Sequence, residues 1–251
     1  SAGSISRHHV TTFTGNHTYT GNTLVTGTLL LDANAKLGFG TVTVSNGTLG
    51  LKPGASISNT TAINSGGKIN GTGTITNLTV NNGGKIAPGD PTGTQIGTLT
   101  FSELTLAGGS TYEWNLQNPS GTVGSGWDSI AISSPTTLTF TADVNTKFNL
   151  KLISLTSGGV AGMATGFTQQ TYNWEIASSS SIVGFSSAIA NIDSSDFSTN
   201  LATGGTFALY TQGTSLMLSF TPVPEPATYV LMATGLSVLA GAGWRRRRRV
   251  S

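Results

Sequence analysis

The sequence predicts an all-β protein built around a right-handed β-solenoid of about five short coils over residues 20–110. Composition, turn chemistry and a regular lysine spacing lead to this expectation. The chain includes 34 Gly, 41 Thr and 29 Ser. Gly and Thr are poor helix formers, and the good formers Leu, Glu, Lys and Arg are scarce. The chain is 37% apolar and nearly neutral, so we expect a packed core rather than disorder.

The coils are indicated by a repeat in the first half of the chain. Lys36, Lys52, Lys68 and Lys85 follow one another at nearly equal intervals, and no other lysine precedes Lys147. After each of them, short stretches rich in Thr or Ser and apolar residues alternate with Asn-Gly or Gly-Gly pairs, which suit turns of positive φ. One such unit cannot bury its apolar face alone, but stacked units can. A meandering β-sandwich is the competing architecture, and the lysine spacing argues against it.

Residues 111–221 predict an antiparallel β cap on the solenoid, and residues 1–19 a separate N-terminal segment. From Trp127 onward the regular spacing is lost. Alternating apolar patterns then predict strands within residues 127–132, 138–140, 148–152, 207–210 and 216–220. A cap would cover the open strand edge at the end of the stack, which would otherwise invite aggregation.

The C-terminal residues 222–251 combine three features. Pro224-Glu225-Pro226 precedes residues 227–244, which carry no charge, and five arginines follow. A helix over this apolar run would span about 27 Å, close to the hydrocarbon core of a bilayer, so we expect one transmembrane helix. Arginines are costly in the bilayer centre, which predicts that the cluster stays on the cytoplasmic side. A plain C-terminal tail anchor is the simpler alternative.

This order of features resembles the sorting signal of PEP-CTERM proteins. The resemblance implies that Pro224, Glu225 and Pro226 are recognised by an exosortase, a membrane-embedded transpeptidase-like enzyme. It implies that Arg245, Arg246, Arg247, Arg248 and Arg249 form a retention cluster during transient anchoring in the inner membrane. The protein would then pass to the cell surface or extracellular matrix of a Gram-negative bacterium. Export needs a signal peptide, which we expect to have been removed or to be missing here.

A second stretch resembles the autotransporter-associated repeat of passenger domains. The resemblance rests on residues 81–90, 97–101 and 108–114, with Ile86-Ala87-Pro88-Gly89 at the turn. In those proteins such a turn precedes a strand pair that closes a β-helix. The resemblance therefore supports the solenoid expectation.

Charge and cysteine content exclude several classes of function. The net charge of +2 comes from the arginine cluster, because residues 1–244 hold seven basic and ten acidic groups. We therefore expect no nucleic-acid partner. The chain has no cysteine, which excludes disulfides, thiolate metal sites and a cysteine nucleophile.

The remaining chemistry predicts no catalytic residue, metal site or cofactor. Residues 33–89 contain no carboxylate, and Asp32 and Asp90 bracket the coils too far apart to act as a pair. Asp193 and Asp196 predict a solvated loop rather than a calcium site. All three histidines lie within residues 1–17, where a flexible terminus is expected.

The sequence is compatible with three functions. We expect a structural or adhesive protein of the surface matrix, associated with exopolysaccharide or biofilm and not an enzyme. The alternative is a glycan-binding module. Acidic exopolysaccharide would lie along Lys36, Lys52, Lys68 and Lys85, stacked about 5 Å apart, although a solubilising turn lysine repeated with each coil is the simpler explanation. Exposed aromatics would be the other mark of such a module, although we expect Trp114, Trp127 and Trp174 to be buried in the core. A polysaccharide-degrading enzyme is the third possibility.

Overall fold

The protein is described from a computed structural model. The structure describes residues 3–5, 10–90, 92–93, 95–133, 135–198 and 204–223. The motif at 224–226, the apolar run at 227–244 and the arginines at 245–249 lie outside the described residues. No helix in the described part is long and apolar enough to cross a bilayer. The expected transmembrane helix therefore stays a prediction.

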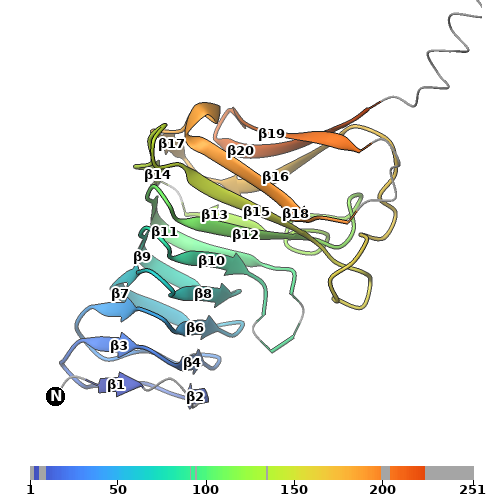
Figure 1. The fold of residues 1–251 in the computed structure, drawn as a ribbon. Coiled ribbons are helices and arrows are strands. Elements are labelled where there is room, and N and C mark those ends of the chain that lie inside the picture. The colour runs from blue at the N-terminus through green and yellow to red at the C-terminus, as the bar shows by residue number, and fades with distance from the viewer. Residues whose placement is uncertain are drawn as a thin grey trace, which may run out of the picture.

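The described chain is mainly β and forms two sheets (Figure 1). The 12-stranded sheet contains β1 (Gly3–Ile5), β3 (Thr23–Val25), β5 (Val42–Val44), β7 (Ser56–Ile63), β9 (Thr74–Val80), β11 (Thr98–Leu106), β13 (Ser129–Ile132), β14 (Thr137–Phe140), β16 (Tyr172–Ser178), β17 (Ser181–Val183), β19 (Gly205–Gln212) and β20 (Ser215–Pro222). The 8-stranded sheet contains β2 (Val10–Phe13), β4 (Thr28–Leu31), β6 (Thr48–Leu51), β8 (Lys68–Gly71), β10 (Lys85–Pro88), β12 (Thr111–Leu116), β15 (Phe148–Ser154) and β18 (Ala190–Asp196). A short 3-10 helix, η1 (Ser187–Ile189), precedes β18.

The first half of the chain alternates between the two sheets, and each strand pairs in parallel with the strand one coil later. Thr28 pairs with Thr48 and Thr48 with Lys68, so these two coils are equal in length. The next coil is slightly shorter, because Lys68 pairs with Lys85. A meandering sandwich would place antiparallel neighbours here, so the parallel pairing excludes it. The predicted β class and stacked coils agree with this arrangement, and the right-handed sense stays a prediction. The predicted start at residue 20 is wrong, because β1 and β2 pair in parallel with β3 and β4, so the described residues before 20 belong to the stack and not to a separate segment.

The core is built from columns of inward side chains, one from each coil. One column in the 12-stranded sheet is continuous in register and fully or almost fully buried: Val25, Val44, Ile63, Val80, Leu106 and Phe140. Burying each such side chain contributes about 1.5–3 kcal/mol. Apolar residues at every second strand position therefore become one continuous core only when the coils stack.

The cap differs from the expectation. Parallel pairing does not stop at residue 110, since β12 pairs with β15 and β15 with β18. Among the described strands, antiparallel pairing is confined to β16 with β20 and β20 with β19, apart from isolated single-residue bridges (Figure 1). The antiparallel cap predicted for residues 111–221 is wrong about its extent. Lengthened loops hide the coil repeat, because Thr111 finds its register partner only at Asn149.

Candidate functional site

The four lysines of the predicted column do not form one column. The interval from Lys36 to Lys52 is shorter than the coil from Thr28 to Thr48, so successive lysines shift along the coil. Lys36 bridges to Asn16 at a coil corner, and Lys52 follows β6 and pairs with Asp32, with an Nζ–Oδ1 distance of 3.5 Å. Only Lys68 and Lys85 are register partners, because the coil between them is the shorter one.

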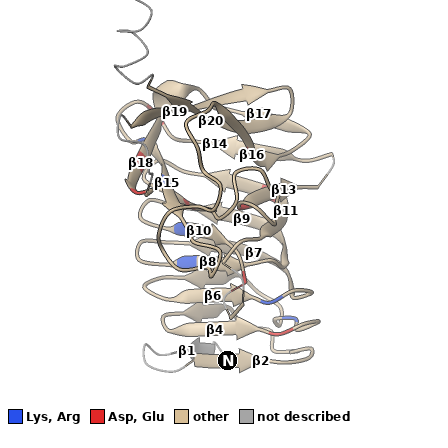
Figure 2. Ribbon diagram, turned by 90° about the vertical axis from the view of Figure 1, so that its right-hand side faces the viewer, with Lys and Arg blue, Asp and Glu red and all other residues tan. Residues whose placement is uncertain are grey.

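Lys68 and Lys85 share one carboxylate on the outer face of the 8-stranded sheet, where Figure 2 shows basic residues on β8 and β10. Lys68 Nζ lies 2.7 Å and Lys85 Nζ 3.2 Å from the Glu113 carboxylate. Lys68 lies in β8 and Glu113 in β12, so the Lys68 side chain reaches across the intervening strand β10. Burial of Glu113 opposes its ionisation, but the two ammonium groups outweigh it and lower the pKa of that carboxyl. The three groups form a compact cluster of net charge +1.

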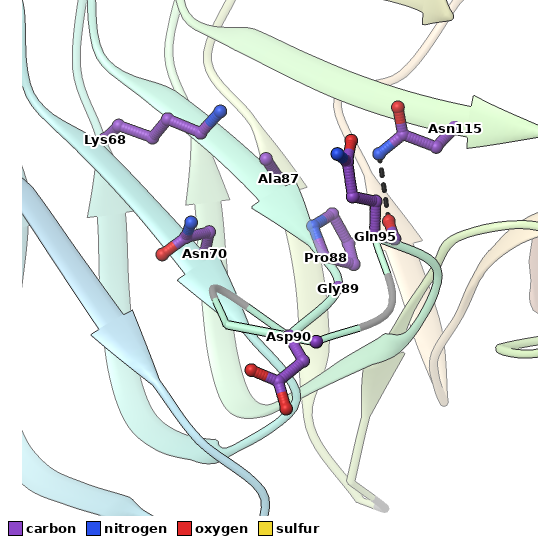
Figure 3. Close-up of a pocket in the computed structure, with 9 residues that line it drawn as sticks. Lys68, Asn70, Ala87, Pro88, Gly89, Asp90, Gln95 and Asn115 are labelled. Atoms are coloured by element: carbon purple, nitrogen blue, oxygen red, sulfur yellow. Dashed lines mark hydrogen bonds between the residues drawn. The ribbon is translucent and has the colours of Figure 1, made fainter. Parts of the chain in front are cut away.

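A hollow of about 300 Å³ lies beside this cluster (Figure 3). It is lined by Lys68, Asn70, Ala87, Pro88, Gly89, Asp90, Gly93, Gln95 and Asn115. Asn70 Oδ1 is shielded from solvent and has no hydrogen-bond partner, whereas Asp90 Oδ1 accepts from the amide and hydroxyl of Thr92. The hollow thus offers donors and acceptors with little net charge. Such a lining suits hydroxyl groups better than a polyanion.

Asp128, which the sequence did not single out, is the most enclosed carboxylate of the described residues. It is fully buried and accepts from Gly97 N at 2.9 Å, from Asn115 N at 3.0 Å and from Asn115 Nδ2 at 2.8 Å. Burial raises its pKa well above the usual range, and the three N–H donors oppose that rise. Asp128 joins the starts of β11 and β13 to β12. Its only sequence signal is an acid directly before an apolar strand.

Asp193 and Asp196 lie in β18, which pairs with β15 at the edge of the 8-stranded sheet, so the loop expected for them is wrong. Lys151 Nζ lies 2.6 Å from Asp196 Oδ2, and Asp193 Oδ1 accepts from Ser195 N, a bond that lowers the pKa of Asp193. No group of three or more His, Cys, Asp or Glu side chains in the described residues could hold a metal ion.

The three tryptophans considered as glycan platforms are buried. Trp114, Trp127 and Trp174 are 0%, 8% and 1% exposed. Their indole nitrogens donate to the backbone carbonyls of Asp128, Glu175 and Pro119, respectively. The expectation that these tryptophans belong to the core is confirmed, and the exposed aromatic platform considered for a glycan-binding module is ruled out, since both the ring faces and the indole N–H groups serve the core.

The comparisons with known proteins bear on the C-terminus. Residues 222–248 match the family model described as the PEP-CTERM protein-sorting motif. No curated protein matches the chain. The resemblance of residues 81–114 to autotransporter-associated repeats is not supported by a family match and stays a prediction. The match begins at Pro222, the last residue of β20, so the signal follows the outer strand pair directly. The chain therefore carries a PEP-CTERM signal, which targets proteins to exosortase and to the cell surface or extracellular space.

Proposed function

We propose that this protein is a structural or adhesive component of the cell-surface matrix, delivered by exosortase-type sorting. The observation that carries the proposal is the joint between β20 and the signal. β20 pairs with both β16 and β19, and the sorting match starts at its last residue. The stack thus ends in a hydrogen-bonded strand pair from which the signal leaves, so loss of the signal need not disturb the stack.

Within the signal, we propose that Pro224, Glu225 and Pro226 are the recognised element. Residues 227–244 would hold the chain in the inner membrane until processing, and residues 245–249 would remain cytoplasmic. The physical support is the length of the apolar run and the cost of moving arginine into a bilayer.

The deciding experiment is the intact mass of the protein recovered from the surface and medium of its host. We expect loss of residues from about Pro226 onward, with full-length chain accumulating in the membrane when alanines replace residues 224–226. Pro53→Ala, in an exposed turn, is the matched control and should be processed normally. A full-length parent chain left in the membrane would instead indicate a plain tail anchor.

We also propose that the protein is not an enzyme. In the described residues, Glu113 is held by two lysines and Asp128 is enclosed by three N–H donors, so neither is free to serve as an acid or base. Incubation with matrix polysaccharides should release no reducing ends. Release that disappears in a Glu113→Gln variant would overturn the proposal.

Binding of acidic exopolysaccharide is the second candidate function. It no longer involves all four lysines of the predicted column. Lys52, Lys68 and Lys85 each make an ion pair, which reduces their attraction for a polyanion. Lys36 makes no ion pair within the described residues. Replacing Lys52, Lys68 and Lys85 by Ser should therefore leave retention on acidic polysaccharide nearly unchanged, and the same experiment on Lys36 becomes the informative one.

A further inference from the structure

A second hollow, of about 450 Å³, lies at the corner where three successive N-terminal coils turn. Its lining comes from residues 16–18, 36–40, 56 and 58–59. These segments are neighbours because Lys36 pairs with Asn16 and because the Lys36 amide donates to Gly15 O. The hollow is thus formed by the stack itself, and it is separate from the Lys68 cluster.

Phe39 projects from this corner and is 69% exposed, the largest exposed fraction among the large apolar residues described. Its backbone is held from both sides. The Phe39 amide donates to Tyr19 O at 2.7 Å, and Asn59 Nδ2 donates to Gly38 O at 2.7 Å and to Gly40 O at 2.6 Å. Single exposed apolar residues are common and need no explanation by themselves. Here the backbone is held by the coils before and after it, which keeps the exposed Phe39 side chain at this corner.

Two polar groups accompany Phe39 in the same lining. Lys36 is exposed and has no ion pair within the described residues, unlike the other three lysines of the repeat. His17 is stacked on Phe13 with ring centroids 4.1 Å apart, and its Nε2 is shielded from solvent without a hydrogen-bond partner. A shielded polar atom that lacks a partner is costly, and because His17 lines the hollow, a turn of its ring would let a ligand hydroxyl supply that partner.

We propose that this corner binds a uronic-acid unit of an acidic polysaccharide. The C–H face of the sugar ring packs on Phe39, the carboxylate accepts from Lys36 Nζ, and a hydroxyl bonds His17 Nε2. A ring on a fixed backbone, a lysine with no ion pair within the described residues and an unsatisfied nitrogen in one hollow match these three parts of a carboxylated sugar. The proposal rests on acidic-exopolysaccharide binding, the second candidate function above, and adds the sugar unit and the residues that hold it. The surface location proposed there supplies only its biological setting.

The test is calorimetric titration of the full chain in detergent with oligogalacturonate and oligomannuronate of about six units. We expect at least one to bind, and its methyl-esterified form, which keeps the ring but loses the charge, to bind about tenfold more weakly. Lys36→Gln and Phe39→Ala should each weaken binding about tenfold, and His17→Phe, which keeps the stacking on Phe13, about threefold to tenfold.

Matched controls come from the same chain. Lys147→Gln removes another exposed lysine, and Val160→Ala another exposed apolar side chain, 66% exposed, both outside the hollow. Both should bind like the parent. Three results would overturn the proposal: neither oligosaccharide binds, Lys36→Gln and Phe39→Ala bind like the parent, or poly-glutamate binds as well as the sugars and competes with them.

The sorting proposal fails or holds separately. A Lys36→Gln/Phe39→Ala double variant should still lose its C-terminus and reach the surface, because neither residue belongs to the signal. Normal sorting together with lost binding supports the sugar site, whereas unchanged binding in a chain that is correctly sorted refutes the site alone.

Discussion

The early coils and the later coils of this protein use the same two-sheet arrangement with different interiors. Through residue 90, short coils of similar length enclose aliphatic side chains, and their corners are tight turns. After residue 95, the coils lengthen, as from Thr111 to Asn149, and enclose aromatic rings, including Trp114 packed against Trp174 at a centroid distance of 5.5 Å. Longer coils accompany a core of larger side chains. The comparison teaches that strand register, not coil length, defines this stack.

The two regions also illustrate two ways of holding neighbouring coils together. In the early coils, glycines at positive φ come close to the coil before them, as Gly71 does to Leu51 and Gly66 to Asn46. In the later region, the buried Asp128 carboxylate accepts from the backbone amides of Gly97 and Asn115 and so joins these two segments. Substituting one turn glycine and one buried side chain should show how much the stability of each region depends on that kind of contact.

The largest effect is expected for the aromatic interior. Trp114→Ala should lower the free energy of unfolding by about 3–5 kcal/mol, because it leaves a cavity and removes the indole hydrogen bond to Asp128 O. Urea unfolding followed by circular dichroism measures this. Leu49→Ala, equally buried in β6, is the aliphatic comparison and should cost less. A larger loss for Leu49→Ala would mean that the early coils dominate stability.

Asp128→Ala should cost about 2–4 kcal/mol, because it leaves three buried N–H donors without an acceptor. The raised pKa means that the folded protein binds a proton more tightly than the unfolded chain. The parent therefore loses stability as pH rises above about 4, the pKa of an aspartate in the unfolded chain. The difference in free energy of unfolding between the parent and Asp128→Ala should become smaller over the same range.

The matched control for Asp128 is Asp143→Ala. Asp143 also accepts two backbone amides, from Asn145 and Thr146, but it is exposed. Water can replace its carboxylate, so we expect a loss of less than about 1 kcal/mol. If urea unfolding gives equal losses of stability for Asp128→Ala and Asp143→Ala, burial of the Asp128 carboxylate does not add to the cost of removing it.

Gly71→Ala tests the turn chemistry of the early coils and should cost about 2–3 kcal/mol. Its φ is +131°, and an added Cβ would lie 2.0 Å from Leu51 O, a backbone atom of the preceding coil. Gly213→Ala, at φ +60° with nothing within 4 Å, carries strain without the clash and should cost about 1 kcal/mol. Thermal unfolding of both variants should reproduce this order. A larger loss of stability for Gly213→Ala would mean that contact with the preceding coil at Gly71 is not what makes glycine necessary there.

The smallest effect is expected for the shared ion pair. Glu113→Gln should lose about 1 kcal/mol at pH 7, a value reduced by the partial exposure of both lysines. The lowered pKa of Glu113 means that its contribution is present above about pH 4.3, the unfolded value, and is lost as pH falls through the folded one. The free energies of unfolding of the variant and the parent, measured by urea unfolding, should therefore become equal in acid. Glu103→Gln, on an exposed side chain with no ion pair within the described residues, is the control and should unfold like the parent at pH 7.

Strand positions were partly predictable from local pattern. The alternation at residues 41–44 predicts β5, and that at residues 148–152 predicts most of β15. The coil length was not predictable, because the interval from Lys36 to Lys52 is shorter than the true coil from Thr28 to Thr48. Exposed side chains are free to follow another spacing, since only the inward positions are constrained by packing.

The candidate sites were less predictable than the strands. Glu113 lies far along the chain from Lys68, and Asp128 lies far from Gly97, yet each pair is in hydrogen-bond contact. The corner at Phe39 needs residues from three coils. Stacking sets these neighbours, and no local pattern records it.

By itself, the sequence determined the β class, the turn chemistry and the sorting signal. Turn chemistry is local in φ, and a sorting signal is read by another protein as a linear segment, so neither needs the fold. The tertiary structure alone decided which lysines are neutralised, which carboxylates are enclosed and which aromatic ring stays in water. Those properties depend on distances between coils, which the register of the stacked strands sets.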